Sequence, residues 1–95
     1  MEHVRTIRRR FVFYGRVQGV GFRYHASHKA RSLGITGWVR NEYDGSVTLE
    51  AQGPEECLDM LLAHLMNDRY IGIDDYTCEA LPVDENEWTF GVEGY

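Results

Sequence analysis

Apolar residues recur with a period of two in some parts of the chain and with a period near 3.6 in others, which predicts alternating strands and helices. The first run covers residues 9–15. Its alternation gives two faces, and both carry apolar or aromatic residues: Phe11 and Phe13 on one face, Val12 and Tyr14 on the other. A short strand that is apolar on both sides is typical of the middle of a sheet.

A helix is predicted after the glycine-punctuated stretch that follows this strand. Four apolar residues recur at offsets of four, four and three: Phe22, Ala26, Ala30 and Leu33. This spacing places them in one stripe on a helix of about residues 22–33. Gly34 stands where a left-handed C-terminal cap is expected.

The middle of the chain predicts a hairpin and a second helix. Asp44-Gly45 separates two β-prone runs, residues 35–41 and 47–52, and Asp-Gly is a hairpin signal because glycine supplies positive φ. Pro54 suits the first position of the next helix. The buried stripe of that helix consists of leucines: Leu58, Leu61, Leu62 and Leu65.

Weaker patterns complete the chain. A looser strand is expected over about residues 74–81, and Trp88, Phe90 and Val92 alternate in a last short strand. The order is β-α-β-β-α-β with a short C-terminal strand, which predicts an α+β, ferredoxin-like split β-α-β sandwich. Both helices should cover one face of a mostly antiparallel sheet. A length of 95 residues at 43% apolar content suits one domain, residues 1–95.

Composition narrows the class of protein. The longest nearly uncharged apolar run, residues 11–15, is far shorter than the ~18–20 residues that span a bilayer, so we expect a cytoplasmic protein without a membrane partner. Cys57 and Cys78 are interpreted as ordinary buried thiols.

The formal charge of −5 is unevenly distributed between the two halves of the chain. Residues 1–43 hold nine Lys/Arg against two Asp/Glu, and residues 44–95 hold one against thirteen. An anion should therefore bind in the first half.

The loop of residues 15–23 is the candidate anion site. It joins a central strand to a helix, so free backbone N–H groups and the helix dipole converge there. Glycines at 15, 19 and 21 let the backbone curl around an anion, and Arg23 can bind two phosphate oxygens at once. The plain alternative is a strand-to-helix turn with a solvated arginine. The loop lacks the Lys-Ser/Thr ending of a P-loop, a third glycine of the G-x-G-x-x-G type, and a cysteine nucleophile.

Two long motifs resemble the signature of the acylphosphatase family. The first is residues 15–23, Gly-Arg-Val-Gln-Gly-Val-Gly-Phe-Arg; the second includes Gly-Trp-Val-Arg-Asn at 37–41, Asp-Gly-Ser-Val at 44–47 and Gln-Gly at 52–53. The resemblance implies metal-independent hydrolysis of acyl phosphates to a carboxylate and inorganic phosphate, with no cofactor. It also implies that Gln18, Gly19, Val20, Gly21 and Phe22 cradle the phosphate, that Arg23 binds it, and that Asn41 holds the attacking water.

Asn41 also has a plainer interpretation. From its place alone it is a turn residue that caps the Asp44-Gly45 loop, whereas the resemblance favours the water-binding role. Arg40 should lie on the other face of the strand and outside the site, as a solvated or paired surface charge.

Other signals compete with this interpretation. His25 and His28 are too few ligands for a convincing metal site. The aromatics Phe11, Phe13, Tyr14 and Trp38 are better explained by core packing than by base stacking, because the second half is acidic and no RNP-like motif occurs, so no nucleic-acid partner is expected. The run Arg8-Arg9-Arg10 is interpreted as a solvated edge rather than a polyanion patch.

Two alternatives to the enzyme remain. One is a non-catalytic anion-binding or partner-docking module, against which the presence of both Arg23 and Asn41 argues. The other is the carbamoyl-phosphate-handling module of larger maturation proteins, against which the short length argues. The chain departs from the usual family pattern at 67–75 and in the acidic tail 93–95, so packing and substrate preference there stay open. We expect a monomer.

Overall fold

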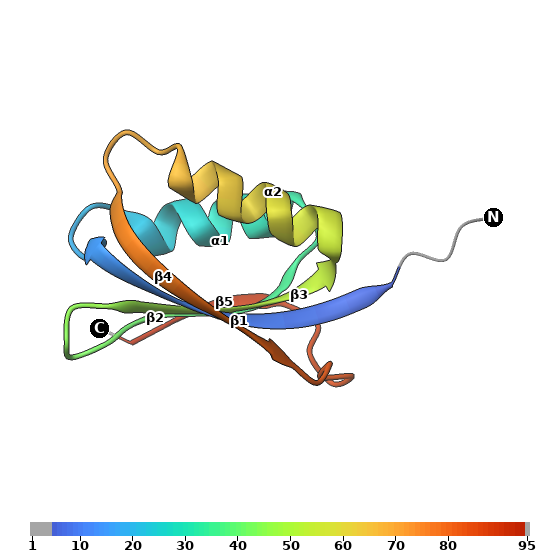
Figure 1. The fold of residues 1–95 in the computed structure, drawn as a ribbon. Coiled ribbons are helices and arrows are strands. Elements are labelled where there is room, and N and C mark those ends of the chain that lie inside the picture. The colour runs from blue at the N-terminus through green and yellow to red at the C-terminus, as the bar shows by residue number, and fades with distance from the viewer. Residues whose placement is uncertain (1–4, 95) are drawn as a thin grey trace.

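The computed structural model describes residues 5–94, which form one five-stranded sheet and two helices (Figure 1). In chain order the elements are β1 (Thr6–Arg16), α1 (Phe22–Ser32), β2 (Thr36–Asn41), β3 (Val47–Pro54), α2 (Glu55–Met66), β4 (Gly72–Leu81) and β5 (Phe90–Glu93). The strand order across the sheet is β4-β1-β3-β2-β5, and only β2 and β5 are parallel. Both helices lie on the same face of the sheet, as Figure 1 shows, which confirms the predicted ferredoxin-like α+β sandwich.

The core lies between the helices and the sheet. Strand β1 has neighbours on both sides and turns Phe11 and Phe13 toward this core, where they are 3% and 0% exposed. The predicted helical stripes supply the opposite wall: Phe22, Ala26 and Ala30 from α1, and Leu58, Leu61 and Leu65 from α2. Removing these side chains from water positions α1 over the sheet and fixes the β1–α1 loop at its end.

The face of the sheet without helices carries a polar network. Arg8 is only 6% exposed and donates hydrogen bonds to Glu50 and Glu87, while Arg10 bonds the other carboxylate oxygen of Glu50. The expectation of a solvated arginine edge is therefore wrong for Arg8, because acidic residues far away in sequence cover it. Arg9 faces the helix side and pairs with Glu55 at 2.8 Å.

Several finer expectations need correction. Tyr14 and Trp38 lie on the helix-free face, outside the core, because side chains alternate along a strand and only one face is covered. Neither cysteine is fully buried: Cys57 of α2 is half-buried, and Cys78 is exposed on edge strand β4. Trp88 was expected in the last strand, but it precedes β5 and is 83% exposed.

The bounds of the helices also differ slightly from the prediction. Pro54 ends β3, so α2 begins one residue later than predicted, and α1 ends before Leu33. Leu62 of the predicted α2 stripe is only half-buried.

The segment after α2 closes into a turn. Asp68 accepts hydrogen bonds from the backbone N–H groups of Tyr70 and Ile71, and Ile71 returns to the core at 6% exposure. The unusual segment 67–75 is thus packed through its own aspartate. Of the acidic tail, Glu93 lies in β5 and Tyr95 falls outside the described residues. Neither helix among residues 5–94 has the length and apolar character needed to cross a membrane.

Candidate active site

One cavity of about 220 Å³ lies between the β1–α1 loop and the end of β2. Its lining residues come from both segments: Val17, Gly19, Gly21, Phe22, Arg23, Tyr24 and Asn41. Two sequence motifs, whose residues Arg23 and Asn41 are 18 positions apart, therefore meet in space. Of the predicted site residues, the structure brings Gly19, Gly21, Phe22, Arg23 and Asn41 to the cavity, whereas Gln18 and Val20 turn elsewhere.

The loop backbone is open toward this cavity. Gly19 and Gly21 have φ of 73° and 81°, the left-handed region that glycine adopts without strain. Within the described chain, none of the N–H groups of residues 18–21 donates a hydrogen bond. The first turn of α1 adds N–H groups that no helical carbonyl can accept. Successive unpaired N–H groups in a curled loop form a concavity suited to an anion, and the dipole of α1 points its positive end at the same place.

Arg23 is the second residue of α1, which places its side chain beside the loop. Its Nη1 donates to the carbonyl oxygen of Glu93 in β5 at 3.1 Å. Four other arginines of the basic half are neutralised by carboxylates: Arg8, Arg9, Arg10 and Arg40. Arg23 makes no such ion pair within residues 5–94. Four of the nine Lys/Arg residues of the first half are therefore paired with carboxylates, whereas Arg23 keeps its charge for a ligand.

Asn41 is the last residue of β2, where it pairs with Val47 of β3. The hairpin turn is capped by Asp44, whose carboxylate accepts hydrogen bonds from the backbone N–H and the hydroxyl of Ser46. No hydrogen bond of the Asn41 side chain occurs in the described part of the chain. The capping role belongs to Asp44, so the amide of Asn41 is available to a ligand in the cavity.

The side chain of Gln18 links the β1–α1 loop to the hairpin between β2 and β3. Its side-chain amide donates to the carbonyl oxygens of Glu42 at 2.7 Å and Ser46 at 2.9 Å. The Glu42 carboxylate is fixed in turn by hydrogen bonds from Thr48 and then Arg40, which together lower the pKa of Glu42 below its usual range. Arg40 is thus the paired surface charge that was predicted. Gln18 therefore connects the two segments that form the cavity but does not line it. Val20 is partly buried against the core.

The two histidines lie beside the cavity. His25 Nε2 is 3.7 Å from a carboxylate oxygen of Asp68, and both His25 and His28 contact the ring of Tyr24. Residues 5–94 contain no group of three or more His, Cys, Asp or Glu side chains that could hold a metal ion.

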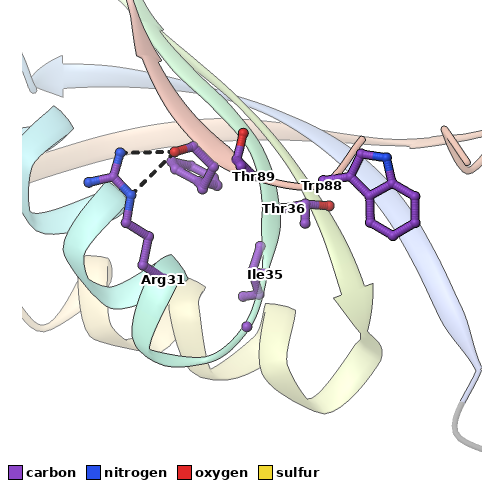
Figure 2. Close-up of a pocket in the computed structure, with 7 residues that line it drawn as sticks. Arg31, Ile35, Thr36, Trp88 and Thr89 are labelled. Atoms are coloured by element: carbon purple, nitrogen blue, oxygen red, sulfur yellow. Dashed lines mark hydrogen bonds between the residues drawn. The ribbon is translucent and has the colours of Figure 1, made fainter. Parts of the chain in front are cut away.

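A larger cavity of about 570 Å³ lies at the other end of α1 (Figure 2). Arg31 donates two hydrogen bonds there to the carbonyl oxygen of Phe90, which holds the start of β5 against the helix. The Trp88 indole lies beyond Thr36, away from Arg31 (Figure 2). The guanidinium is occupied and no acid, thiol or histidine lines this space. The smaller cavity is the better candidate because it combines unpaired backbone N–H groups, the Asn41 amide and a guanidinium that donates only one hydrogen bond within the described chain.

Sequence reasoning missed some of the surroundings of the site. Val17 and Tyr24 line the cavity, and Tyr24 had one available signal, its place directly after Arg23 in the first turn of the helix. The contact between Arg23 and the Glu93 carbonyl spans 70 residues and had no signal in the sequence.

The chain is similar to known acylphosphatases along most of its length. The Acylphosphatase family model matches residues 9–92. The acylphosphatase of Bifidobacterium longum is 43% identical over 93 residues, 96% of each chain. That of Salinibacter ruber is 62% identical over 81 residues, 85% of this chain and 81% of the relative. The crystal structure of acylphosphatase from Bacillus subtilis has a TM-score of 0.86 at 31% identity and covers 93% of this chain and 99% of that one.

The fold and the cavity define the general class, a ferredoxin-like α+β protein with an amide-lined cavity at its first strand-to-helix loop. Because the family model spans residues 9–92 and the relatives exceed 40% identity over most of the chain, the chain belongs to the acylphosphatase family, a family of hydrolases.

Proposed function

We propose that this chain hydrolyses the carboxyl-phosphate bond of acyl phosphates, without a metal ion, to a carboxylate and inorganic phosphate. The observation that carries the proposal is the meeting of three features in one cavity: the unpaired loop amides, Arg23 and Asn41. The names of the similar proteins support the same reaction.

In the proposed reaction the phosphate lies in the loop of residues 18–22. The backbone N–H groups and the Arg23 guanidinium donate to its nonbridging oxygens. Charge spreads over these oxygens in the loose transition state of phosphoryl transfer, so fixed donors and a cation can supply most of the stabilisation. Metal-independent catalysis is reasonable because Arg23 provides the charge that Mg²⁺ supplies in other phosphoryl-transfer sites.

The nucleophile in this proposal is a water held by Asn41. A neutral amide cannot remove a proton, but it can donate to and accept from one water and so fix its direction of attack. The water oxygen bonds to phosphorus as the bond from phosphorus to the acyl oxygen breaks, and that electron pair leaves on the carboxylate. The water proton passes to a phosphate oxygen. The leaving acid has a pKa of about 4–5, so no general acid is needed.

Steady-state hydrolysis of benzoyl phosphate with EDTA present tests the proposal. We expect turnover that is unaffected by the chelator and inhibited competitively by inorganic phosphate. A non-catalytic anion-binding module would bind phosphate without turnover. Loss of activity in EDTA, restored by added metal, would contradict the metal-independent mechanism. A monomeric, cytoplasmic protein without a nucleic-acid partner stays a prediction.

A further inference from the structure

The candidate active cavity is too small to enclose a whole substrate. Its volume of about 220 Å³ is below the ~300–1,000 Å³ of pockets that bury a complete small-molecule ligand. With the phosphate in the loop, as the proposed function requires, the acyl group must extend past the rim of the cavity. Whatever recognises the acyl group therefore stands at this rim.

Tyr24 is the residue of the rim that can make such a contact. Val17 and Phe22 are 0% and 2% exposed and form the floor, while Gly19 and Gly21 have no side chain. Arg23 and Asn41 are engaged with the phosphate and the water in the proposed reaction. Tyr24, which is 65% exposed, remains as the one lining residue with an accessible apolar side chain.

The Tyr24 ring is held in place by its own helix. His25 meets it edge-on with ring centroids 5.4 Å apart, and His28, one turn later, lies against it at 5.6 Å with the rings 31° apart. A ring supported in this way loses little conformational freedom when another flat group packs on its free side. Exposed aromatic area fixed beside a reaction site favours ligands that are flat and apolar.

We infer that Tyr24 forms the acyl-binding subsite and makes the enzyme prefer acyl phosphates with aromatic or conjugated acyl groups over short aliphatic ones. This inference rests on the proposed function. A ring pair contributes enough to change a specificity ratio about two- to tenfold. Because the contact is made in both the ground state and the transition state, it should act mainly on KM.

The test compares kcat/KM for benzoyl phosphate and acetyl phosphate. Tyr24→Ala should lower the benzoyl-to-acetyl ratio about two- to tenfold, mainly through the KM of benzoyl phosphate, and Tyr24→Phe should retain the wild-type ratio. Trp88→Ala is the matched control, since it removes an 83% exposed aromatic from the other end of α1. It should leave the ratio unchanged.

Two outcomes overturn the inference while leaving the proposed function intact. One is an active Tyr24→Ala variant with the wild-type ratio; the other is an equal loss for both substrates, which would mean that Tyr24 only supports the loop. If the wild-type chain hydrolyses neither substrate, the proposed function fails and the assignment of Tyr24 fails with it.

Discussion

The side-chain Nε2 of Gln18 lies 2.7 Å from the carbonyl oxygen of Glu42, so the β1–α1 loop is joined directly to the residue that follows Asn41. A second hydrogen bond from the same nitrogen reaches the carbonyl of Ser46 across the hairpin. These bonds fix the distance between the loop amides and the Asn41 side chain, which belong to segments otherwise joined only through the sheet and α1. We therefore predict that Gln18 is a positioning residue, which holds the loop amides and Asn41 in register.

Replacing Gln18 with alanine tests this role. We expect kcat/KM to fall by about tenfold to a hundredfold, because a displacement of about 1 Å between reacting groups is enough for such a loss. Two lost hydrogen bonds should lower the free energy of unfolding by about 1–3 kcal/mol. Asn67→Ala is the control, since it removes an amide-to-carbonyl bond of 2.8 Å at the end of α2. Equal activity in the two variants would show that the Gln18 bonds serve stability alone.

Arg23→Ala should remove both turnover and phosphate inhibition. The guanidinium is the one cation that lines the cavity, and it supplies paired donors that a small side chain cannot replace. A decrease in kcat/KM of roughly 10³-fold or more is expected, as when an arginine that stabilises phosphoryl transfer is lost. Competitive inhibition by phosphate gives the binding measurement. Lys29→Ala, which removes a cation two turns along α1, should behave as wild type. Equal phosphate inhibition of wild type and Arg23→Ala would contradict the role of Arg23.

Asn41→Ala should have a different kinetic signature. If Asn41 orients the attacking water, kcat should fall by about a hundredfold while the inhibition constant of phosphate changes little. Stability should hardly change, because Asp44 and not Asn41 caps the hairpin turn. Asp44→Ala gives the matched comparison, because it removes the two hydrogen bonds to Ser46 and should lower the free energy of unfolding. A destabilised Asn41→Ala variant with normal kcat would return Asn41 to a turn-capping role.

The sequence predicted the parts of the fold and site that depend on local order. Three local signals each specify one short segment: the glycine positions, the helical stripe that begins at Phe22, and the Asp44-Gly45 turn. These segments form the two sides of the cavity, which are the β1–α1 loop with the start of α1 and the end of β2. The ferredoxin-like arrangement then follows from the element order and the handedness of the crossovers.

What the sequence could not predict depends on contacts between distant segments. Period-two alternation separates the two faces of a strand but does not say which face the helices cover, so Trp38 was placed in the core. Arg8 was interpreted as solvated because its partners Glu50 and Glu87 follow 42 and 79 residues later. The contact of Arg23 with β5 needs the strand order of the whole sheet, since β5 joins beside β2.

Glu50 makes the stability of the fold sensitive to acid. It lies between Arg8 at 2.8 Å and Arg10 at 2.7 Å on the helix-free face of the sheet. Burial opposes its ionisation, but the hydrogen bonds from the two arginines outweigh burial and lower the pKa of Glu50 below its ordinary 4.5. Because the folded-state pKa is below that of the unfolded chain, these bonds stabilise the protein above about pH 4.5. This stabilisation is lost as pH falls through the lowered pKa.

Glu50→Gln should therefore lower the free energy of unfolding by about 1–3 kcal/mol at pH 7, because buried Arg8 loses one of its two carboxylate partners and keeps Glu87. The difference from wild type should shrink as pH falls below 4.5 and through the lowered pKa of Glu50, where Glu50 itself becomes protonated. Urea unfolding at pH 7, 4.5 and 3 measures it. Glu79→Gln is the control: its carboxylate is exposed and 3.8 Å from Arg10, so its effect should stay within about 1 kcal/mol at every pH. A Glu50→Gln deficit that does not change with pH would mean that side-chain packing, and not charge, causes the loss.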